Sequence, residues 1–413
     1  MTETADVSPP LSGCRVLDLS DRTGAYCTKV LADLGADVIK VELPAGDELR
    51  RVPPFRDGAA LRDGAALRDG AEGTESSLMF AYYHHNKRGI TLDFRQPAAE
   101  PLLRELAAKS DVIIASPTRR QPVFGLEESS PALRWAGADR LTCFVTPFGM
   151  TGPLRRWRST PFTSFAMSGY MNPVGPLDGP PLYMPGQQLF DESGVHLALL
   201  IQSLMLEPNG SGPRVVDHAV HDAGHFKKLA LERYGLNGRI VDRATNFGPP
   251  PGGIWKTADG HVDIGCHSPR HWDIFVEVLG QPATLADELY RDRSMRAQLF
   301  DLVTSLIAEE LAPWSAKEFV RLGQAKGLPC AVRQGPSDFV RDEQPLARGF
   351  FISSARPGTG EFPVPGPVFK SEPTMIAYTR SAPTLGESND EIYRDELNHS
   401  ASELADWRAR ELI

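Results

Sequence analysis

The chain has 413 residues, of which 41% are hydrophobic and 23% charged, and its formal net charge at pH 7 is −9. That length is more than one simple hydrophobic core organises, and it predicts two or three domains. The excess of acidic over basic residues excludes a general role in binding nucleic acid or another polyanion.

The N-terminal segment MTETADVSPP is acidic and polar, unlike a secretory signal or a basic transit peptide. The longest apolar run, around Val195 to Leu206, is shorter than the ~20 apolar residues that a membrane span needs, and it is typical of a buried helix. The cysteines are scattered and form no CxxC pair, as expected for reduced thiols: Cys14, Cys27, Cys143, Cys266 and Cys330. We therefore expect a cytoplasmic protein with neither a membrane nor a nucleic-acid partner.

The N-terminal part of the chain alternates short apolar runs with helical patterns. Residues 15–19 and 38–41 are predicted strands, and residues 26–34 between them have helical spacing. A strand, a helix and a strand within about 30 residues form a βαβ unit, which implies a parallel sheet with right-handed crossover. The pattern continues with strands predicted at 89–94, 111–114 and 141–145 and a helix at 99–109. This alternation predicts an α/β fold.

A hexapeptide repeat interrupts this pattern at residues 56–71, where RDGAAL occurs twice and RDGA follows. Its small residues, its charge and its lack of aromatic residues predict a disordered or loosely helical surface insertion. A tandem duplication in a tolerant loop explains the repeat, and a flexible lid is the functional alternative.

The second half of the chain contains further predicted helices, a loop and a boundary between domains. A helix is predicted at 191–206, a loop follows at 207–213, and the Gly/Pro-rich residues 246–253 predict a boundary. Beyond it the sequence predicts a hairpin, three helices and a C-terminal helix, at 253–265, 272–279, 295–311, 315–326 and 402–411. The stretch from this boundary to Lys326 is therefore predicted to be a separate small α+β domain, and the final stretch from Pro329 is Pro/Gly-rich with short strands before the C-terminal helix.

A cluster of histidines and aspartates lies near the predicted boundary: Asp217, His218, His221, Asp222 and His225. The three histidines could face one way on a helix, and that spacing could bind zinc. No HExxH pattern accompanies them, which favours ordinary histidines without a metal. GxGxxG and P-loop patterns are also missing from the sequence, so dinucleotide or ATP chemistry has no support.

Short motifs follow one another in a fixed order over almost the whole chain. They are LSGCRVLDLS (11–20), YCTKVLADLGADVIKVELPAGDELRR (26–51), NKRGITLDFRQP (86–97), PFGMTGP (147–153), AMSGYM (166–171), RVVDHAVHDA (214–223), WKTADGHVDIG (255–265), LARGFF (346–351) and APTLGES (382–388). In these motifs the chain resembles the class III CoA-transferase family (CaiB/BaiF type), the group of formyl-CoA transferase, carnitine CoA-transferase and α-methylacyl-CoA racemase.

The resemblance implies a Rossmann-like large domain built from residues 1–224 and 329–413, with a small α+β domain of residues 225–328 inserted. It also implies an interlocked homodimer in which each chain threads through the other and the active site lies between domains of both chains. The implied substrates are coenzyme A, as an acyl-CoA, and a small carboxylic acid, and no metal cofactor is expected.

The family's nucleophile is an aspartate just before an apolar helix, and the matching segment PLYMPGQQLFD ends at Asp191. Such a carboxylate attacks an acyl-CoA to give a mixed anhydride, the released thiolate forms an aspartyl-CoA thioester, and an incoming acid takes over the CoA. The start of a helix favours the ionised carboxylate. A helix-capping aspartate without catalysis is the alternative. Only Glu192 and Ser193 precede Gly194, where the family has three residues, so Glu192 could share the role.

The phosphates of CoA require cationic contacts, which arginines at strand ends can supply. The positions that match the family's CoA site are Asp21, Arg22, Thr23, Leu92, Arg95, Ser116, Pro117 and Arg158. Arg119 and Arg120 are nearby candidates for a phosphate. For each arginine, a solvated surface residue is the plain alternative.

The sequence departs from the family at several of these places. Ala115-Ser116-Pro117 replaces a Glu-Asn-Phe sequence, Pro161 replaces an acidic residue, the first loop is one residue shorter, and the glycine-rich loop is reduced to residues 248–253. The histidine of the racemase branch falls at Thr160, which cannot exchange an α-proton. We expect an acyl-CoA:carboxylate CoA-transferase. The alternatives are a diverged acyl-CoA hydrolase or isomerase and a non-catalytic CoA-binding homologue.

Overall fold

The structure is a computed structural model. It describes residues 8–56, 75–117, 140–176, 179–184, 186–207, 214–224, 234–236, 238, 248–356, 360–372, 374–376 and 378–413. The chain divides into two compact units, one of Met1–Gly169, Met184–Lys227 and Ala347–Ile413, the other of Tyr170–Tyr183 and Lys228–Leu346. Most of the RDGAAL repeat, together with Arg119, Arg120 and His225, lies outside the described residues.

A six-stranded parallel sheet organises the first unit. Its strands are β1 (Arg15–Leu19), β2 (Asp37–Glu42), β3 (Arg88–Thr91), β4 (Val112–Ala115), β5 (Leu141–Thr146) and β6 (Arg214–Ala219). Their order is β3-β2-β1-β4-β5-β6, and every neighbouring pair is parallel. The predicted α/β fold with a parallel sheet is therefore confirmed. From β1 the chain first adds β2 and β3 on one side, and it then adds β4, β5 and β6 on the other side. Ligands of such sheets bind at this switch point, between β1 and β4.

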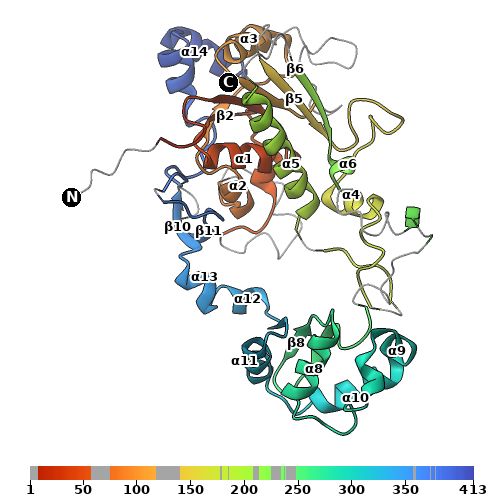
Figure 1. The fold of residues 1–413 in the computed structure, drawn as a ribbon. Helices are drawn as coiled ribbons and strands as arrows, with labels where there is room; N and C mark the ends of the chain where they lie inside the picture. The colour runs from red at the N-terminus through yellow and green to blue at the C-terminus, as the bar shows by residue number, and fades with distance from the viewer. Residues whose placement is uncertain are drawn as a thin grey trace. The chain divides into compact units, whose positions relative to one another are not determined.

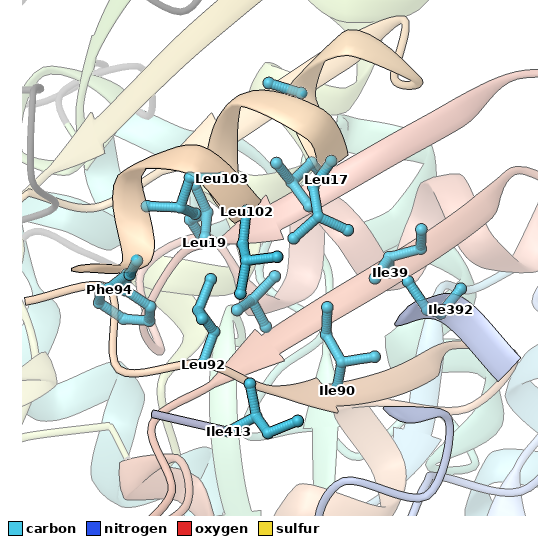
Figure 2. Packing of buried hydrophobic residues seen from close by; sticks show 14 of the residues in the cluster. Leu17, Leu19, Ile39, Ile90, Leu92, Phe94, Leu102, Leu103, Ile392 and Ile413 are labelled. Atoms are coloured by element: carbon cyan, nitrogen blue, oxygen red, sulfur yellow. The ribbon is translucent and has the colours of Figure 1, made fainter. Parts of the chain in front are cut away.

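Helices cover the sheet on both faces. Helices α1 (Ala25–Asp33) and α5 (Gln188–Met205) lie side by side (Figure 1). On the opposite face, α3 (Glu100–Ala108) packs with the C-terminal segments η7 (Asp390–Glu396) and α14 (Ala401–Ala409) around a core of strand and helix side chains (Figure 2). The remaining helical segments of this unit are η1 (Glu48–Arg51), α2 (Leu78–Tyr83), η4 (Pro97–Ala99), α4 (Pro161–Met167) and α6 (Val220–Gly224).

The close approach of α1 and α5 depends on Gly194. A Cβ atom at this position would lie 2.8 Å from the backbone nitrogen of Cys27 and 2.9 Å from Cβ of Tyr26. Because backbone atoms of α1 cannot move aside as a flexible side chain could, even one methyl group would push the two helices apart. The absence of a side chain at Gly194 is thus what lets α5 lie directly against α1.

Gly194→Ala is therefore expected to destabilise the fold by about 1–3 kcal/mol through overpacking, although alanine favours helix. Urea unfolding followed by circular dichroism measures this loss. Gly186→Ala is a comparison for generic glycine effects, since a Cβ there would meet nothing within 4 Å but φ is +92°. An unchanged midpoint for Gly194→Ala would contradict this account of the α1–α5 packing.

The NKR motif joins the C-terminal part of the chain to the sheet. Asn86, with φ +62°, accepts hydrogen bonds at Oδ1 from the backbone nitrogens of Thr379 (2.8 Å) and Arg380 (3.1 Å). Arg88 binds Asp37 (2.6 Å) and also Glu391 (2.9 Å). The ends of the motif therefore have structural partners, which explains how residues distant in sequence form one unit.

The middle residue of the motif, Lys87, belongs to a buried polar network. Its Nζ lies 3.2 Å from Oδ2 of Asp18 and donates to Oγ1 of Thr28 at 2.7 Å. Asp18 and Lys87 are fully buried. Burial would raise the pKa of Asp18, but the charges of Lys40 and Lys87 outweigh it and hold that pKa below its usual value. The strand face toward α1 thus contains paired charges, whereas the opposite face is apolar.

The second unit has a hydrophobic core of its own, around Trp272, Phe275 and Phe319. It contains an antiparallel sheet of β7 (Gly253–Lys256), β8 (His261–Ile264) and β9 (Cys330–Val332), which confirms the predicted hairpin. The helices of this part of the chain are α8 (Pro269–Val278), η6 (Glu288–Arg291), α9 (Arg293–Gln298), α10 (Phe300–Leu311), α11 (Ala316–Lys326), α12 (Pro336–Phe339) and α13 (Glu343–Ala347). An antiparallel hairpin of β10 (Phe351–Arg356) and β11 (Gly360–Pro365) follows in the chain and belongs to the first unit.

Two predictions differ from these elements. The helix expected at 295–311 is two helices, because Leu299 (φ −100°, ψ 32°) leaves the helical conformation between them. The strand expected at 89–94 ends at Thr91. Leu92 and Phe94 continue the apolar pattern but enter the core from a turn. Of the described helices, none has the length and apolarity to span a membrane.

Candidate functional site

The site lies where α1 and α5 begin, beside the switch point of the sheet. The loop after β1 contains Asp21 and Thr23, and Ser116 directly follows β4. The hydroxyls of Thr23 and Ser116 are 3.0 Å apart, and Thr23 donates both its hydroxyl (2.6 Å) and its backbone N–H (2.9 Å) to Asp21. Burial raises the pKa of Asp21, and the bonds from Thr23 partly oppose that shift. Small polar groups therefore lie together after β1 and β4.

Arg22 joins this loop to the start of α5. Its Nη2 donates to Oε1 of Gln187 at 2.9 Å, its Nε lies 3.9 Å from Oε1 of Glu48, and its guanidinium lies 5.9 Å from the ring centre of Phe190. Burial raises the pKa of Glu48 to about 7, with further increases from Asp21 and Asp47. A half-buried cation with a neutral amide as its nearest acceptor can bind an incoming anion.

Asp191 occupies the first turn of α5, as predicted, and is half-buried. The Tyr83 hydroxyl, at the end of α2, donates to Oδ1 of Asp191 at 2.7 Å. The Asp191 backbone N–H bonds to the carbonyl of Gln187, so the helix itself satisfies it. Among the described residues, the hydrogen bond to this carboxylate is received at Oδ1. A carboxylate that is oriented by one donor can present its other oxygen as a nucleophile.

The environment of Asp191 favours its protonated form. Burial raises the pKa of Asp191 to about 6, the Tyr83 hydrogen bond opposes the shift, the charge of Glu192 adds to it, and Arg22 lowers it. Burial and the nearby Asp191 charge raise the pKa of Tyr83, so the phenol remains a donor. A carboxyl with a pKa near 6 is ionised at neutral pH but incompletely solvated, and such groups gather at functional sites.

Glu192, the second carboxylate of the segment, has different contacts. Its Oε1 accepts a hydrogen bond from the side chain of Gln188 at 2.9 Å. The hydrogen bond from Tyr83 goes to Asp191 instead. The hydrogen bond from Tyr83 therefore favours Asp191 as the carboxylate that is oriented within the site.

The other predicted ligand residues are more dispersed. Leu92 is fully buried within the apolar core, so its side chain offers no surface to a ligand. Arg95 is exposed and forms a two-pronged ion pair with Asp93 at 2.7 and 2.9 Å. Arg158 is exposed in the loop before α4, and Pro117 is half-buried beyond β4. The structure thus brings Asp21, Arg22, Thr23 and Ser116 together, and the sequence pattern alone could not separate them from the rest.

The interpretation of the histidine cluster as one helix face is wrong. His218 lies on strand β6, where its Nε2 is 2.8 Å from Oγ of Ser193, whereas His221 lies on helix α6. Burial lowers the pKa of His218. Asp217 accepts the backbone N–H of Met150 and so fixes the PFGMTGP loop. Among the residues that the structure describes, no group of three His, Cys, Asp or Glu side chains is placed to hold a metal.

Thr160, the position at which a histidine would be expected in the racemase branch, caps helix α4. Its Oγ1 accepts the backbone N–H of Thr163, and the Thr163 side chain bonds back to the Thr160 N–H. Pro161 occupies the first helical position, where proline is well tolerated. This reciprocal capping gives both residues a structural role.

The sequence alone does not single out two residues of the site, Tyr83 and Gln187. Tyr83 precedes the NKR motif by three positions, and Gln187 lies within the segment that ends at Asp191. Neither belongs to a catalytic pattern that one sequence can reveal, because their importance depends on α2, α5 and the β1 loop meeting in space. A prediction of contacts between those segments would have found them.

Comparison with known proteins gives consistent matches over the length of the chain. Residues 11–389 match the model of CoA-transferase family III. The chain is 30% identical to the succinyl-CoA–L-malate CoA-transferase alpha subunit of Chloroflexus aurantiacus, over 98% of this chain and 92% of that protein. It is also 30% identical to the succinate–glutarate CoA-transferase of Agrobacterium fabrum, over 95% of this chain and 97% of that protein. The crystal structure of a CAIB/BAIF family protein from Brucella suis aligns with a TM-score of 0.77 at 25% identity, covering 94% of this chain and 100% of that one.

Proposed function

The chain belongs to CoA-transferase family III, as its motifs predicted, and from this membership we propose that it transfers CoA between carboxylic acids with Asp191 as the nucleophile. The observation that carries the proposal is the half-buried Asp191 carboxylate, which Tyr83 orients by a 2.7 Å hydrogen bond at the start of α5. Membership makes the chain a transferase, and the geometry supplies a residue able to form the covalent intermediates.

The proposed reaction begins when an oxygen of Asp191 attacks the thioester carbonyl of an acyl-CoA. The new C–O bond forms as the carbonyl π electrons move to oxygen, and collapse of that oxyanion breaks the C–S bond and releases CoA thiolate. The thiolate attacks the aspartyl carbonyl of the mixed anhydride, which yields an aspartyl-CoA thioester and the free donor acid. The acceptor carboxylate then repeats these two steps in reverse, and Asp191 is regenerated.

For CoA itself we propose a site at the C-terminal ends of β1 and β4. Asp21, Thr23, Ser116 and Pro117 would line the nucleotide, and Arg22 would supply positive charge. Arg95 and Arg158, both exposed, would reach the phosphates from the rim. Leu92 could contribute only its backbone, because its side chain is buried.

We propose dicarboxylic acids as the donor and acceptor class. The name of one relative pairs succinyl-CoA with L-malate, and the name of the other pairs succinate with glutarate. Succinate, malate and glutarate are all dicarboxylates. Arg22, held near Asp191 by Gln187, offers a cation that could meet the second carboxylate of such an acid.

The proposed assembly is an interlocked cytoplasmic homodimer. Residues 1–224 and 329–413 would form the large domain, and residues 225–328 the inserted small domain. The shared unit formed by N-terminal and C-terminal segments supports the interrupted large domain.

Exchange of isotopically labelled free acids into CoA thioesters tests the function. The protein is incubated with succinyl-CoA and labelled malate, glutarate, oxalate or acetate, and thioesters are separated by chromatography. We expect label in malyl-CoA or glutaryl-CoA without net loss of thioester. Net hydrolysis without exchange would favour the hydrolase alternative, and neither reaction together with CoA binding would favour a non-catalytic protein.

Tyr83→Phe should shift the acid limb of the pH–rate profile to higher pH. Losing a hydrogen bond that favours the carboxylate raises the pKa of Asp191 above about 6, on the order of one further unit. Since attack requires the ionised form, activity at pH 6 falls more than activity at pH 8. Tyr82→Phe, which removes the neighbouring hydroxyl, is the matched control. An acid limb that stays in place in Tyr83→Phe would contradict the assigned contact.

A further inference from the structure

The side-chain amide of Gln187 contains a buried donor that the described structure leaves unused. Gln187 is 3% exposed, and its Nε2 has no partner of hydrogen-bond geometry among the described residues. A buried N–H without an acceptor costs on the order of 1–3 kcal/mol, so such a group calls for an explanation. Gln187 also makes no side-chain cap for α5, although it is the N-cap residue.

Arg22 determines which end of this amide is the donor end. Arginine can only donate hydrogen bonds, so the atom that faces its Nη2 at 2.9 Å must be the carbonyl oxygen Oε1. The two ends of a glutamine side chain are hard to distinguish by shape, but this partner leaves one orientation. Nε2 is therefore the end of the amide that does not meet Arg22, and it is the end without a partner in the part of the chain that the structure describes.

The Tyr83 hydroxyl links the Gln187 amide to the proposed nucleophile, Asp191. The Gln187 amide is close enough to the Tyr83 hydroxyl to lower the pKa of that phenol, and the same hydroxyl donates to Oδ1 of Asp191 at 2.7 Å. The Gln187 backbone carbonyl accepts the Asp191 N–H at 3.1 Å, which fixes the two residues one turn apart on α5. A neutral donor in this place does not compete with the carboxylate for protons.

We propose that Nε2 of Gln187 donates a hydrogen bond to the oxyanion that forms when Asp191 attacks the thioester carbonyl, and that Arg22 holds the amide in the donating orientation. The inference rests on the proposed function. As the C–O bond forms, the carbonyl electron pair moves to oxygen, and Nε2 would donate to the negative charge that develops there. When the oxyanion collapses and the thiolate leaves, the hydrogen bond weakens, and no proton is transferred. A donor already in place stabilises this charge without reorganisation.

Two substitutions separate donation from packing. Gln187→Glu keeps an acceptor for Arg22 but removes the donor, and Gln187→Met removes both at similar volume. Gln202→Met, in the same helix, is the matched control, because Gln202 donates within that helix, to the carbonyl of Ala198. The full-length protein is mixed with succinyl-CoA and hydroxylamine, and the single-turnover rate of hydroxamate formation at residue 191 is followed by mass spectrometry, with kcat and KM measured in parallel.

We expect both Gln187 variants to lose about 10²–10³-fold in single-turnover rate and in kcat, with KM nearly unchanged. Gln202→Met should retain the wild-type rate. An unchanged single-turnover rate in Gln187→Glu, or a loss confined to KM, overturns the proposal, and this variant decides the matter if Gln187→Met does not fold. If the wild-type protein forms no hydroxamate at residue 191, the proposed function itself fails, which is a separate result from a failure of the Gln187 variants alone.

Discussion

Asp191→Asn is expected to abolish CoA transfer and to stabilise the folded chain at neutral pH. Asparagine cannot form the mixed anhydride, so we expect a loss of at least about 10⁴-fold in kcat. The stability gain follows from the Asp191 pKa of about 6, against the usual value of 3.8. Between pH 4 and pH 6 the unfolded carboxyl has lost its proton while the folded one keeps it, so stability falls as pH rises through this window.

Above pH 6 the folded carboxyl is ionised, and the full cost of burying its charge lowers the folding stability. Removing the charge should recover on the order of 2 kcal/mol of that stability after allowance for partial exposure. Denaturant unfolding at pH 5 and pH 8 measures it, with the larger difference between variant and wild type at pH 8. Glu192→Gln is the control, and it should keep transfer activity while lowering the pKa of Asp191. Full activity in Asp191→Asn, or loss of activity confined to Glu192→Gln, would move the nucleophile to Glu192.

Lys87→Met is expected to cost about 3–5 kcal/mol of folding stability, the largest effect on stability among the substitutions considered. Lys87 and Asp18 are both fully buried, and their charged atoms are 3.2 Å apart. Removing one partner leaves the other as an uncompensated buried charge, although Lys40 still offsets part of it. Urea unfolding at pH 7 measures the loss.

Asp18→Asn combined with Lys87→Met should recover much of that stability, because neither charge then remains unpaired. Lys326→Met is the surface comparison: Lys326 pairs with Glu277 at 2.7 Å, but both side chains are largely exposed, so its loss should cost about 0–1 kcal/mol. If Lys87→Met cost no more than Lys326→Met, the buried network would not contribute to the fold as described. The asparagine in the double variant also tests whether charge or shape matters at position 18.

The elements that the sequence predicts best are those whose side chains repeat with a clear period. The strands that contain Leu17, Ile39 and Ile113 are short apolar runs that are buried in the sheet. The strand–helix–strand spacing around α1 predicts that these strands pair in parallel. The position of Asp191 in the first helical turn was also predictable, because a polar segment gives way there to an apolar helix. In each case local sequence and final structure depend on the same residues.

Predictions failed or stopped where long-range contacts decide the outcome. The spacing of His218 and His221 could have suited one face of a helix, but pairing with β5 makes His218 part of a strand. Leu92 matched a ligand position by motif, yet its side chain completes the core. The Tyr83–Asp191 and Arg22–Gln187 bonds join residues 108 and 165 positions apart, and no local pattern specifies such pairs.

The most direct test of covalent catalysis is trapping the Asp191 anhydride or thioester with hydroxylamine. The wild-type protein is incubated with succinyl-CoA, treated with hydroxylamine, digested and analysed by peptide mass spectrometry, with Asp191→Asn treated identically. We expect a hydroxamate on the peptide that contains Asp191 and on that carboxyl alone, dependent on succinyl-CoA and lost in the variant. A hydroxamate on Glu192, or rapid CoA exchange without any adduct at residue 191, would contradict it.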